Sequence, residues 1–80
     1  MYDKKDIIGV KLKISVFQSV ERAKKYIVSQ GFKPNYRKKE PQNVGSYWLF
    51  KQKDWGKYLT RPEKETKDGV ILFIYGYDKK

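Results

Sequence analysis

Apolar and polar residues alternate strictly near the start of the chain. Between Gly9 and Val16, valine, leucine and isoleucine take every second position, and two lysines and a serine take the positions between them. A period of two places the two sets of side chains on opposite faces of a β-strand. The pattern therefore predicts a strand over residues 9–16 with one apolar face and one face in water.

The spacing of the apolar residues changes to three and four positions after residue 19. The residues with this spacing are Val20, Ala23 and Ile27, and charged residues occupy the far side. This period is typical of an amphipathic helix. Ser19 can cap its first turn, although Ser15 with Gln18 offers a competing capping box. Gly31 suits the left-handed position that ends a helix, so we expect the helix to stop just before it.

Four further segments have the composition of strands. They are residues 32–40, 46–53, 57–61 and 70–77. We expect the first to be an edge strand, because Pro34 cannot donate a hydrogen bond to a neighbour. Turn residues lie at 41–45. The polar segment 62–69, which contains the turn pair Asp68-Gly69, is expected to be a solvated loop.

The predicted order is a strand, a helix and then three or four strands. It describes a single domain over residues 1–80, with residues 1–6 and 78–80 frayed. The predicted fold class is α+β, with a single helix packed on one face of a four- to five-stranded, mainly antiparallel sheet. One helix covers one face, so we expect the other face to meet water or a partner.

The alternation within each strand divides the sheet into these two faces. We assign the less charged set of each strand to the helix side: Val10, Leu12, Ile14, Val16, Trp48, Phe50, Val70, Leu72 and Ile74. The open face then receives Lys11, Lys13, Lys33, Arg37, Lys39, Tyr47, Lys51, Lys53, Ile71, Phe73, Tyr75 and Tyr77. Trp55, Lys57 and Tyr58 extend this surface from a neighbouring loop. Rings and cations are therefore expected together on the open face, with few carboxylates among them.

The charge of the chain indicates an acidic partner. Its 80 residues include 19 Lys and Arg against 9 Asp and Glu, which gives a formal net charge of +10 and a pI near 9.8. So strong an excess on so short a chain favours a polyanion, and nucleic acid is the commonest one. A domain of this length buries only about 60% of the surface of its unfolded chain, so we expect a small core.

The residue types on which many catalytic sites depend are missing. The chain has no Cys and no His, which removes disulfides, thiolate metal sites and the commonest general base. The carboxylates fall in expected turns, tails and surface positions, and no glycine-rich phosphate loop occurs. We therefore expect neither an enzyme nor a cofactor or metal.

The sequence also predicts a cytoplasmic location and no membrane partner. No segment approaches the roughly 20 apolar residues that a membrane span needs. Charges interrupt the apolar run near the N-terminus, whereas a signal peptide has an uninterrupted apolar core.

An open sheet face that combines rings and cations meets the requirements for binding single-stranded nucleic acid. Bases stack on aromatic side chains at about 1–3 kcal/mol each, and lysines neutralise phosphates without reading sequence. We predict a small nucleic-acid-binding protein with weak sequence specificity, for single-stranded or distorted DNA or RNA. The predicted contacts are Lys11, Lys13, Arg37, Lys39, Tyr47, Lys51, Lys53, Trp55, Lys57, Tyr58, Phe73 and Tyr75. On this prediction Phe73→Ala and Tyr75→Ala lose affinity while they stay folded.

An alternative hypothesis assigns the same face to a protein partner. In it the chain is an interaction protein of the kind found in phages and mobile elements, which forms a homodimer or inhibits an acidic partner protein. The aromatic residues also have a purely structural explanation. Phe73 and Tyr75 would pack across the sheet, and Trp55 with Tyr58 would close a turn over its edge. A nucleic-acid complex dissociates in high salt, whereas a dimer held by apolar faces persists.

The run SVERAKKYIVSQGF, which begins at Ser19 and is followed by strands, resembles the opening of HicA-type toxin domains. In that family a helix ending in Gly-Phe leads into a small sheet related to double-stranded RNA binders. The resemblance spans residues 19–50 at most. Tyr47 stands where the family has a histidine after Gly-Ser, and here a strand precedes the helix. The resemblance therefore implies no RNA cleavage, and we assign no family from it.

Overall fold

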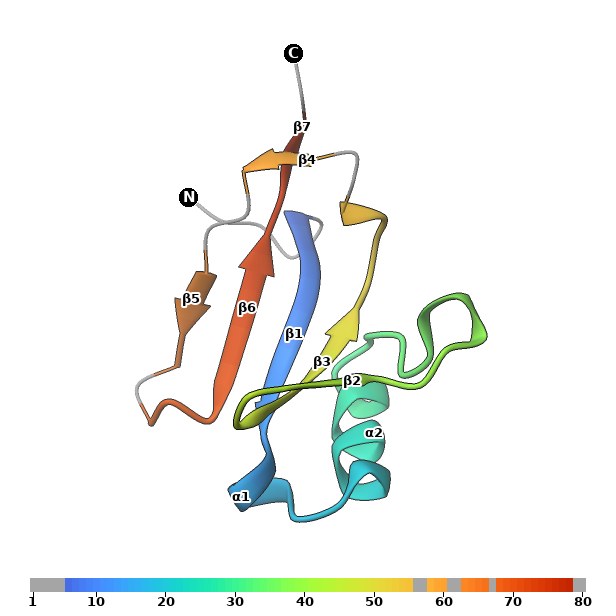
Figure 1. The fold of residues 1–80 in the computed structure, drawn as a ribbon, viewed down its shortest axis with the longest axis vertical. Coiled ribbons are helices and arrows are strands. Elements are labelled where there is room, and N and C mark those ends of the chain that lie inside the picture. The colour runs from blue at the N-terminus through green and yellow to red at the C-terminus, as the bar shows by residue number, and fades with distance from the viewer. Residues whose placement is uncertain (1–5, 56–57, 61–62, 67, 79–80) are drawn as a thin grey trace.

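The computed structural model of the chain describes residues 6–55, 58–60, 63–66 and 68–78. The strands are β1 (Ile7–Lys13), β2 (Gln42–Val44), β3 (Tyr47–Lys51), β4 (Tyr58–Thr60), β5 (Glu63–Glu65), β6 (Ile71–Tyr75) and β7 (Tyr77–Asp78). The helices are α1 (Ile14–Phe17) and α2 (Val20–Ser29), with a 3-10 turn η2 (Tyr36–Lys38). The predicted α+β class, with one main helix and a mainly antiparallel sheet, is confirmed (Figure 1).

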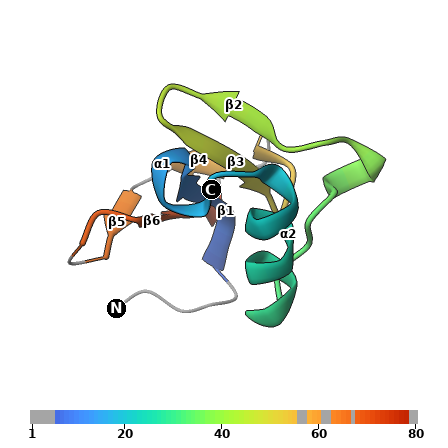
Figure 2. The same cartoon turned by 90° about the horizontal axis from the view of Figure 1, so that it is seen from below.

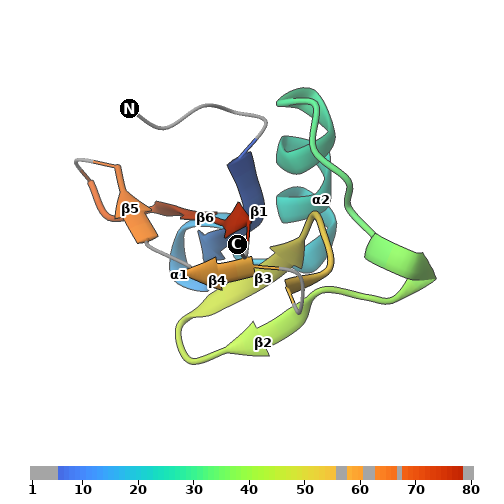
Figure 3. The ribbon, with the colours of Figure 1, turned by 90° about the horizontal axis from the view of Figure 1, so that it is seen from above.

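The strands form one large sheet and one small one. The larger has the order β2-β3-β1-β6-β5, and the smaller pairs β4 with β7; all pairs are antiparallel. α2 lies along one face of the larger sheet, which we call the helix face (Figure 2). β4 lies on the opposite side, which we call the second face (Figure 3).

The first strand is shorter than the alternation predicts. β1 ends at Lys13, and the residues after it form the single helical turn α1. The strands on either side of β1 begin at Tyr47 and Ile71, which already lie opposite Lys13 and Leu12. Residues 14–16 therefore have no strand to pair with, and the prediction of a strand there is wrong.

The predicted helix is confirmed as α2. Its N-cap is Ser19, whose hydroxyl accepts a hydrogen bond from the N–H of Arg22 at 3.3 Å, so the competing capping box is not the one used. At the other end Gly31 has a φ of 82°, and the N–H of Phe32 donates to the carbonyl of Ile27 at 3.0 Å. This geometry ends the helix and turns the chain back towards the sheet.

The edge strand lies later in the chain than predicted. The prediction of a strand over 32–40 is wrong, because this segment is a loop that contains η2. Arg37 and Lys38 have φ angles of 54° and 61°, which a strand excludes. The edge strand is β2, in the segment expected to be a turn, and Gly45 with a φ of 61° makes the turn into β3.

The polar segment expected to be a solvated loop contains β5. This strand pairs with β6 and places Glu63 opposite Ile74 and Glu65 opposite Leu72. The predicted turn at Asp68-Gly69 is confirmed, with a φ of 70° at Gly69. This polar segment therefore becomes an edge strand by pairing with β6, although its own sequence does not favour a strand.

A hydrophobic cluster fills the space between α2 and the sheet. Its buried members are Ile7, Val10, Leu12, Ala23, Ile27, Phe50 and Tyr75, and Phe17, Tyr26, Phe32, Trp48, Ile71 and Phe73 pack around them. The ring centroids of Phe32 and Phe73 lie 6.3 Å apart. The predicted helix-side positions Val10, Leu12, Trp48 and Phe50 are thus confirmed.

The face assignment of the last strand is wrong. Phe73 lies opposite Val10 and Tyr75 lies opposite Ile7, so both rings belong to the helix face. Tyr75 is only 7% exposed. Both faces of β6 are apolar, so no charged residue in this strand shows which set of side chains faces water. The volume between α2 and the sheet decides which set packs there. The residues that α2 buries there are Ala23 and Ile27, and the large rings of β6 fill the remaining room.

The other set of β6 lies on the second face. Leu72 and Ile74, predicted to lie beneath the helix, have their partners Lys11 and Gly9 on that face. Ile74 joins Ile8 and Leu49 in a buried cluster against which Trp55 packs. The second face therefore has a small apolar core of its own.

The ends of the described chain are held by backbone bonds. The carbonyl of Asp6 accepts from the N–H of Gly76 at 2.8 Å, and Asp78 pairs with Tyr58. The remainder of the segments expected to fray lies outside the described residues. None of the helices in the described ranges has the length and apolar character required to cross a membrane.

Candidate nucleic-acid interface

Four of the predicted contact residues lie on the second face within β1 and β3. Lys11 and Lys13 of β1 are opposite Leu49 and Tyr47 of β3, and Lys51 follows on the same side of that strand. The prediction that Lys11, Lys13, Tyr47 and Lys51 share the face away from α2 is confirmed. Their position follows from the period of two in β1 and β3, which continues without a break through this pairing.

The second face carries more negative charge than the sequence indicated. The Lys11 ammonium forms an ion pair with the Glu63 carboxylate at 3.0 Å, and Glu65 stands beside Leu72 on the same face. The expectation of few carboxylates on this face is wrong, because β5 joins the sheet and brings two glutamates to it. The charge of Lys11 is therefore already neutralised, so Lys11 is a weaker candidate for a phosphate contact.

Tyr47 is tied to the turn between β5 and β6. Its hydroxyl donates to the carbonyl of Gly69 at 3.1 Å, and its side chain is half-buried. A buried polar tip with its own partner fixes the ring in place. Tyr47 therefore presents only part of its ring to a ligand.

Trp55 lies across the second face and is held at two points. Its indole Nε1 donates to the carbonyl of Ile8 at 2.9 Å. The ammonium of Lys51 stands 5.5 Å from the ring centroid, within the range of a cation–π contact. The ring and the cation predicted to act together are thus in contact.

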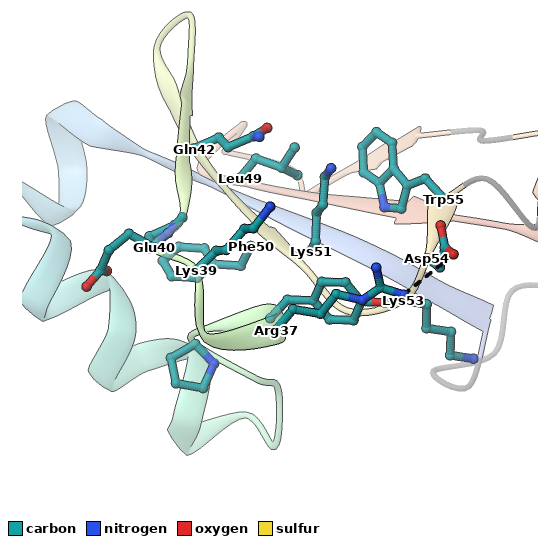
Figure 4. Close-up of a pocket in the computed structure, with 13 residues that line it drawn as sticks. Arg37, Lys39, Glu40, Gln42, Leu49, Phe50, Lys51, Lys53, Asp54 and Trp55 are labelled. Atoms are coloured by element: carbon teal, nitrogen blue, oxygen red, sulfur yellow. Dashed lines mark ion pairs between the residues drawn. The ribbon is translucent and has the colours of Figure 1, made fainter.

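A pocket of about 170 Å³ opens where β2 separates from β3, and we call it the edge pocket (Figure 4). Two chain segments form its walls, the loop after α2 and the end of β3 with the residues that follow it. Its lining residues are Pro34, Tyr36, Arg37, Lys39, Glu40, Pro41, Gln42, Leu49, Phe50, Lys51, Lys53, Asp54 and Trp55. Five of the predicted contacts therefore meet here: Arg37, Lys39, Lys51, Lys53 and Trp55.

The two acidic residues of the edge pocket have cationic partners. Asp54 pairs with the guanidinium of Arg37 at 3.6 Å, which also lies 5.3 Å above the ring of Tyr36. Glu40 pairs with Lys24 of α2. The hydrogen bond from Lys24 stabilises the carboxylate and lowers the pKa of Glu40. The acidic residues therefore brace the walls.

A buried glutamine attaches the pocket loop to β3. The side-chain carbonyl of Gln52 accepts from the N–H of Lys33 at 2.7 Å, and its amide donates to the Lys33 carbonyl at 2.9 Å and to the Phe50 carbonyl at 3.3 Å. Further along, the amide of Asn35 donates to the carbonyl of Lys39 at 3.2 Å. The loop is thus fixed at its start and across its turn, which gives the pocket a preformed wall.

The end of β3 turns a backbone edge towards the pocket loop. In an antiparallel pair, alternate residues direct their N–H and C=O groups to the same neighbour. The backbone N–H of Gln52 donates to the carbonyl of Ile8 in β1 at 2.8 Å. The N–H and C=O of the preceding residue, Lys51, therefore point away from β1, to the side on which β2 pairs with Leu49. β2 begins at Gln42, opposite Leu49, so no described strand pairs with Lys51 on that side.

The remaining predicted contacts are not part of this surface. Phe73 and Tyr75 pack beneath α2, so the prediction that they stack bases on an open face is overturned. Lys57 and the side chain of Tyr58 lie outside the described residues. Tyr36, Glu40 and Asp54 were not among the predicted contacts, because the sequence predicts a strand and a turn for their segments. Only the loop geometry brings them to the pocket.

The described part of the chain contains no group of three or more His, Cys, Asp or Glu residues arranged to hold a metal ion. Comparison of the chain with protein-family models, with curated proteins and with solved structures finds no match. None of these comparisons therefore supports the resemblance to HicA-type domains.

Proposed function

We propose that this protein is a cytoplasmic nucleic-acid-binding protein whose contact surface is the edge pocket and the adjoining part of the second face. One observation carries the proposal. Cationic residues from two separate segments, Arg37 and Lys39 in the loop and Lys51 and Lys53 at the end of β3, line one pocket beside the ring of Trp55. On a chain with a net charge of +10, such a lining suits a polyanion.

The contact is proposed to be mainly electrostatic. Lysines neutralise backbone phosphates, and this term gives affinity without sequence specificity. With Phe73 and Tyr75 in the core, the rings left for bases among the described side chains of this surface are those of Tyr36, Tyr47 and Trp55, and each is half-buried. Stacking therefore contributes through single rings, and unpaired bases of single-stranded or distorted nucleic acid are the ones that can reach them.

The arrangement of apolar residues favours this function over a dimer held by an apolar sheet face. Among the described residues, the large apolar side chains classed as exposed are Val16, Val28 and Val44, which belong to α1, α2 and β2. They do not form a strip on the second face. An acidic partner protein remains the competing ligand, and binding to it without binding to nucleic acid would decide against our proposal.

The test is a binding titration with labelled single-stranded DNA, single-stranded RNA and duplex at several salt concentrations. We expect Lys39→Gln to weaken binding and to make the salt dependence shallower by about 0.7 in the logarithmic slope for each phosphate that the variant no longer neutralises. Lys25→Gln is the matched control, because it removes the same charge from an exposed position of α2 that is not part of the edge pocket.

Two results would overturn the proposal. One is the absence of binding to every nucleic acid at low salt. The other is equal weakening by Lys39→Gln and Lys25→Gln, which would show that only the total charge matters and that the edge pocket is not the site.

A further inference from the structure

The volume of the edge pocket limits the group that it can hold. Pockets for organic ligands usually measure about 300–1,000 Å³, whereas this one measures about 170 Å³. Its lining includes cationic groups, the carboxylates of Glu40 and Asp54, and the side chains of Tyr36, Trp55, Leu49 and Phe50. A single phosphate-sized anion suits this space better than a whole nucleotide or a length of strand.

The charge of the edge pocket matches a doubly charged anion. Figure 4 shows the side chains of Lys39 and Lys51 extending into the pocket, while Glu40 turns towards α2 and Lys53 points away. Arg37 and Asp54 neutralise one another. Within the described ranges, neither Lys39 nor Lys51 has an ion-pair partner. Two positive charges therefore remain.

The two remaining positive charges of the edge pocket suit one of the two kinds of phosphate in a nucleic acid better than the other. An internal phosphodiester carries one negative charge. A terminal phosphate is a monoester with a second pKa near 6, so it carries close to two negative charges at neutral pH. Two lysines with no carboxylate partner in the pocket suit the monoester better, because each added charge-assisted contact strengthens binding.

The edge pocket also offers hydrogen-bond donors at fixed positions. The N–H of Lys51 faces the side of β3 on which β2 lies, just beyond the last β2 pair at Leu49, and its own ammonium lies on the second face nearby. The guanidinium of Arg37 is held by Asp54 and the ring of Tyr36. Fixed donors lose little entropy when an anion binds, which favours a specific site over a diffuse positive surface.

We propose that the edge pocket binds the terminal phosphate of a nucleic-acid strand, with Lys39 and Lys51 as its main charge contacts and Trp55 beside the terminal nucleotide. This inference rests on the proposed function, because it names the part of the nucleic acid that the same surface recognises. The protein is thereby an end-binding protein, whose affinity depends on whether the strand ends in a phosphate or in a hydroxyl.

The experiment compares one oligonucleotide sequence in three forms, with a 5′-phosphate, with a 3′-phosphate and with hydroxyl groups at both ends. Fluorescence anisotropy of an internally labelled strand gives the affinity of each form at neutral pH and constant salt. We expect one phosphorylated form to bind about ten-fold more tightly than the hydroxyl form, the gain from one charged hydrogen bond. Lys39→Gln and Lys51→Gln should each remove most of this preference, and Lys25→Gln should keep it.

Failure of this inference and failure of the proposed function give different results. Equal affinity for all three forms in the unmodified protein would overturn the end-binding inference and leave nucleic-acid binding intact. A preference that survives both Lys39→Gln and Lys51→Gln would also overturn it, because the phosphate would then sit elsewhere. Absence of binding to all three forms would overturn both, even if inorganic phosphate changed the fluorescence of Trp55.

Discussion

The indole ring of Trp55 lies directly against the backbone of Gly9. A Cβ atom at position 9 would stand 2.9 Å from Cζ2 of the ring, closer than carbon atoms of packed side chains approach one another. The ring cannot simply move aside, because its Nε1 is bonded to the carbonyl of Ile8. The missing side chain of Gly9 is therefore what allows the Trp55 ring to approach the second face this closely and to form one wall of the edge pocket.

Gly9→Ala is accordingly expected to destabilise the protein by about 1–3 kcal/mol, the usual cost of forcing an extra group into a packed site. Chemical denaturation measures this cost. In a Trp55→Leu background the ring is absent, so the same substitution should cost clearly less, which a double-mutant cycle detects. An equal cost in both backgrounds would show that Trp55 does not occupy the space beside Gly9.

The aromatic residues of β6 are expected to support folding and not binding. Tyr75→Ala should cost about 3–5 kcal/mol, because it removes a large ring from the core beneath α2. Val28→Ala, at an apolar side chain of α2 that is 57% exposed, should change the free energy of unfolding by less than about 0.5 kcal/mol. Thermal denaturation of the two variants provides the comparison. A Tyr75→Ala variant that is as stable as the parent protein would contradict the packing described for β6.

Gln52 is expected to maintain the position of the pocket loop. Gln52→Met keeps the length of the side chain but leaves both backbone groups of Lys33 without their partner, at a cost of about 1–3 kcal/mol. Gln42→Met is the control, because Gln42 is exposed in β2. Hydrogen exchange at the amide of Lys33 should become faster only in Gln52→Met. Unchanged exchange there would show that the Gln52 amide does not hold the loop.

Asp68 is expected to make folding stability depend on pH in the acid range. The Thr66 hydroxyl at 2.7 Å and the Val70 N–H at 3.1 Å donate to its carboxylate, and they lower the pKa of Asp68. Because the folded-state pKa lies below the unfolded-state value, the stabilisation is present above the unfolded-state pKa and is lost as the pH falls through the folded-state one. The stability difference between the parent protein and Asp68→Asn should therefore shrink in acid.

A second measurement locates the cause of that shift. Thr66→Val removes the donor that contributes most, so the Asp68 carboxyl should titrate at a higher pH in this variant when it is followed by NMR. Titration of Asp68 at the same pH in both proteins would contradict the role of the Thr66 hydroxyl in the β5 to β6 turn.

Local rules were sufficient for the elements whose side chains differ sharply in polarity. The alternation in β1 correctly separates Val10 and Leu12 from Lys11 and Lys13, because burying a lysine would cost far more than burying a leucine. Ser19 and Gly31 mark the ends of α2 through capping geometry that depends only on neighbouring residues.

Strands whose two faces do not differ in polarity could be assigned only from the tertiary structure. Both sets of β6 are apolar, and their faces follow from pairing with β1 and from the room beneath α2, neither of which is a local property. β5 is polar and becomes a strand only because β6 offers an unpaired edge. In the same way, the loop after α2 forms no strand at Arg37 and Lys38, because left-handed backbone angles exclude one there.

The amino-acid sequence alone was enough to establish a small, strongly basic α+β domain with one main helix, because composition and hydrophobic period act on each segment separately. It also showed which cations of β1 and β3 lie away from that helix. The edge pocket could not be predicted from the sequence, because its walls come from two separate segments, residues 34–42 and 49–55. The strand pairing of Gln42 with Leu49, the hydrogen bonds from Gln52 to the neighbouring Lys33 and the Arg37 to Asp54 ion pair hold these segments together. Contacts between distant segments depend on the packing of the whole chain, and that packing decided where the cations and rings gather.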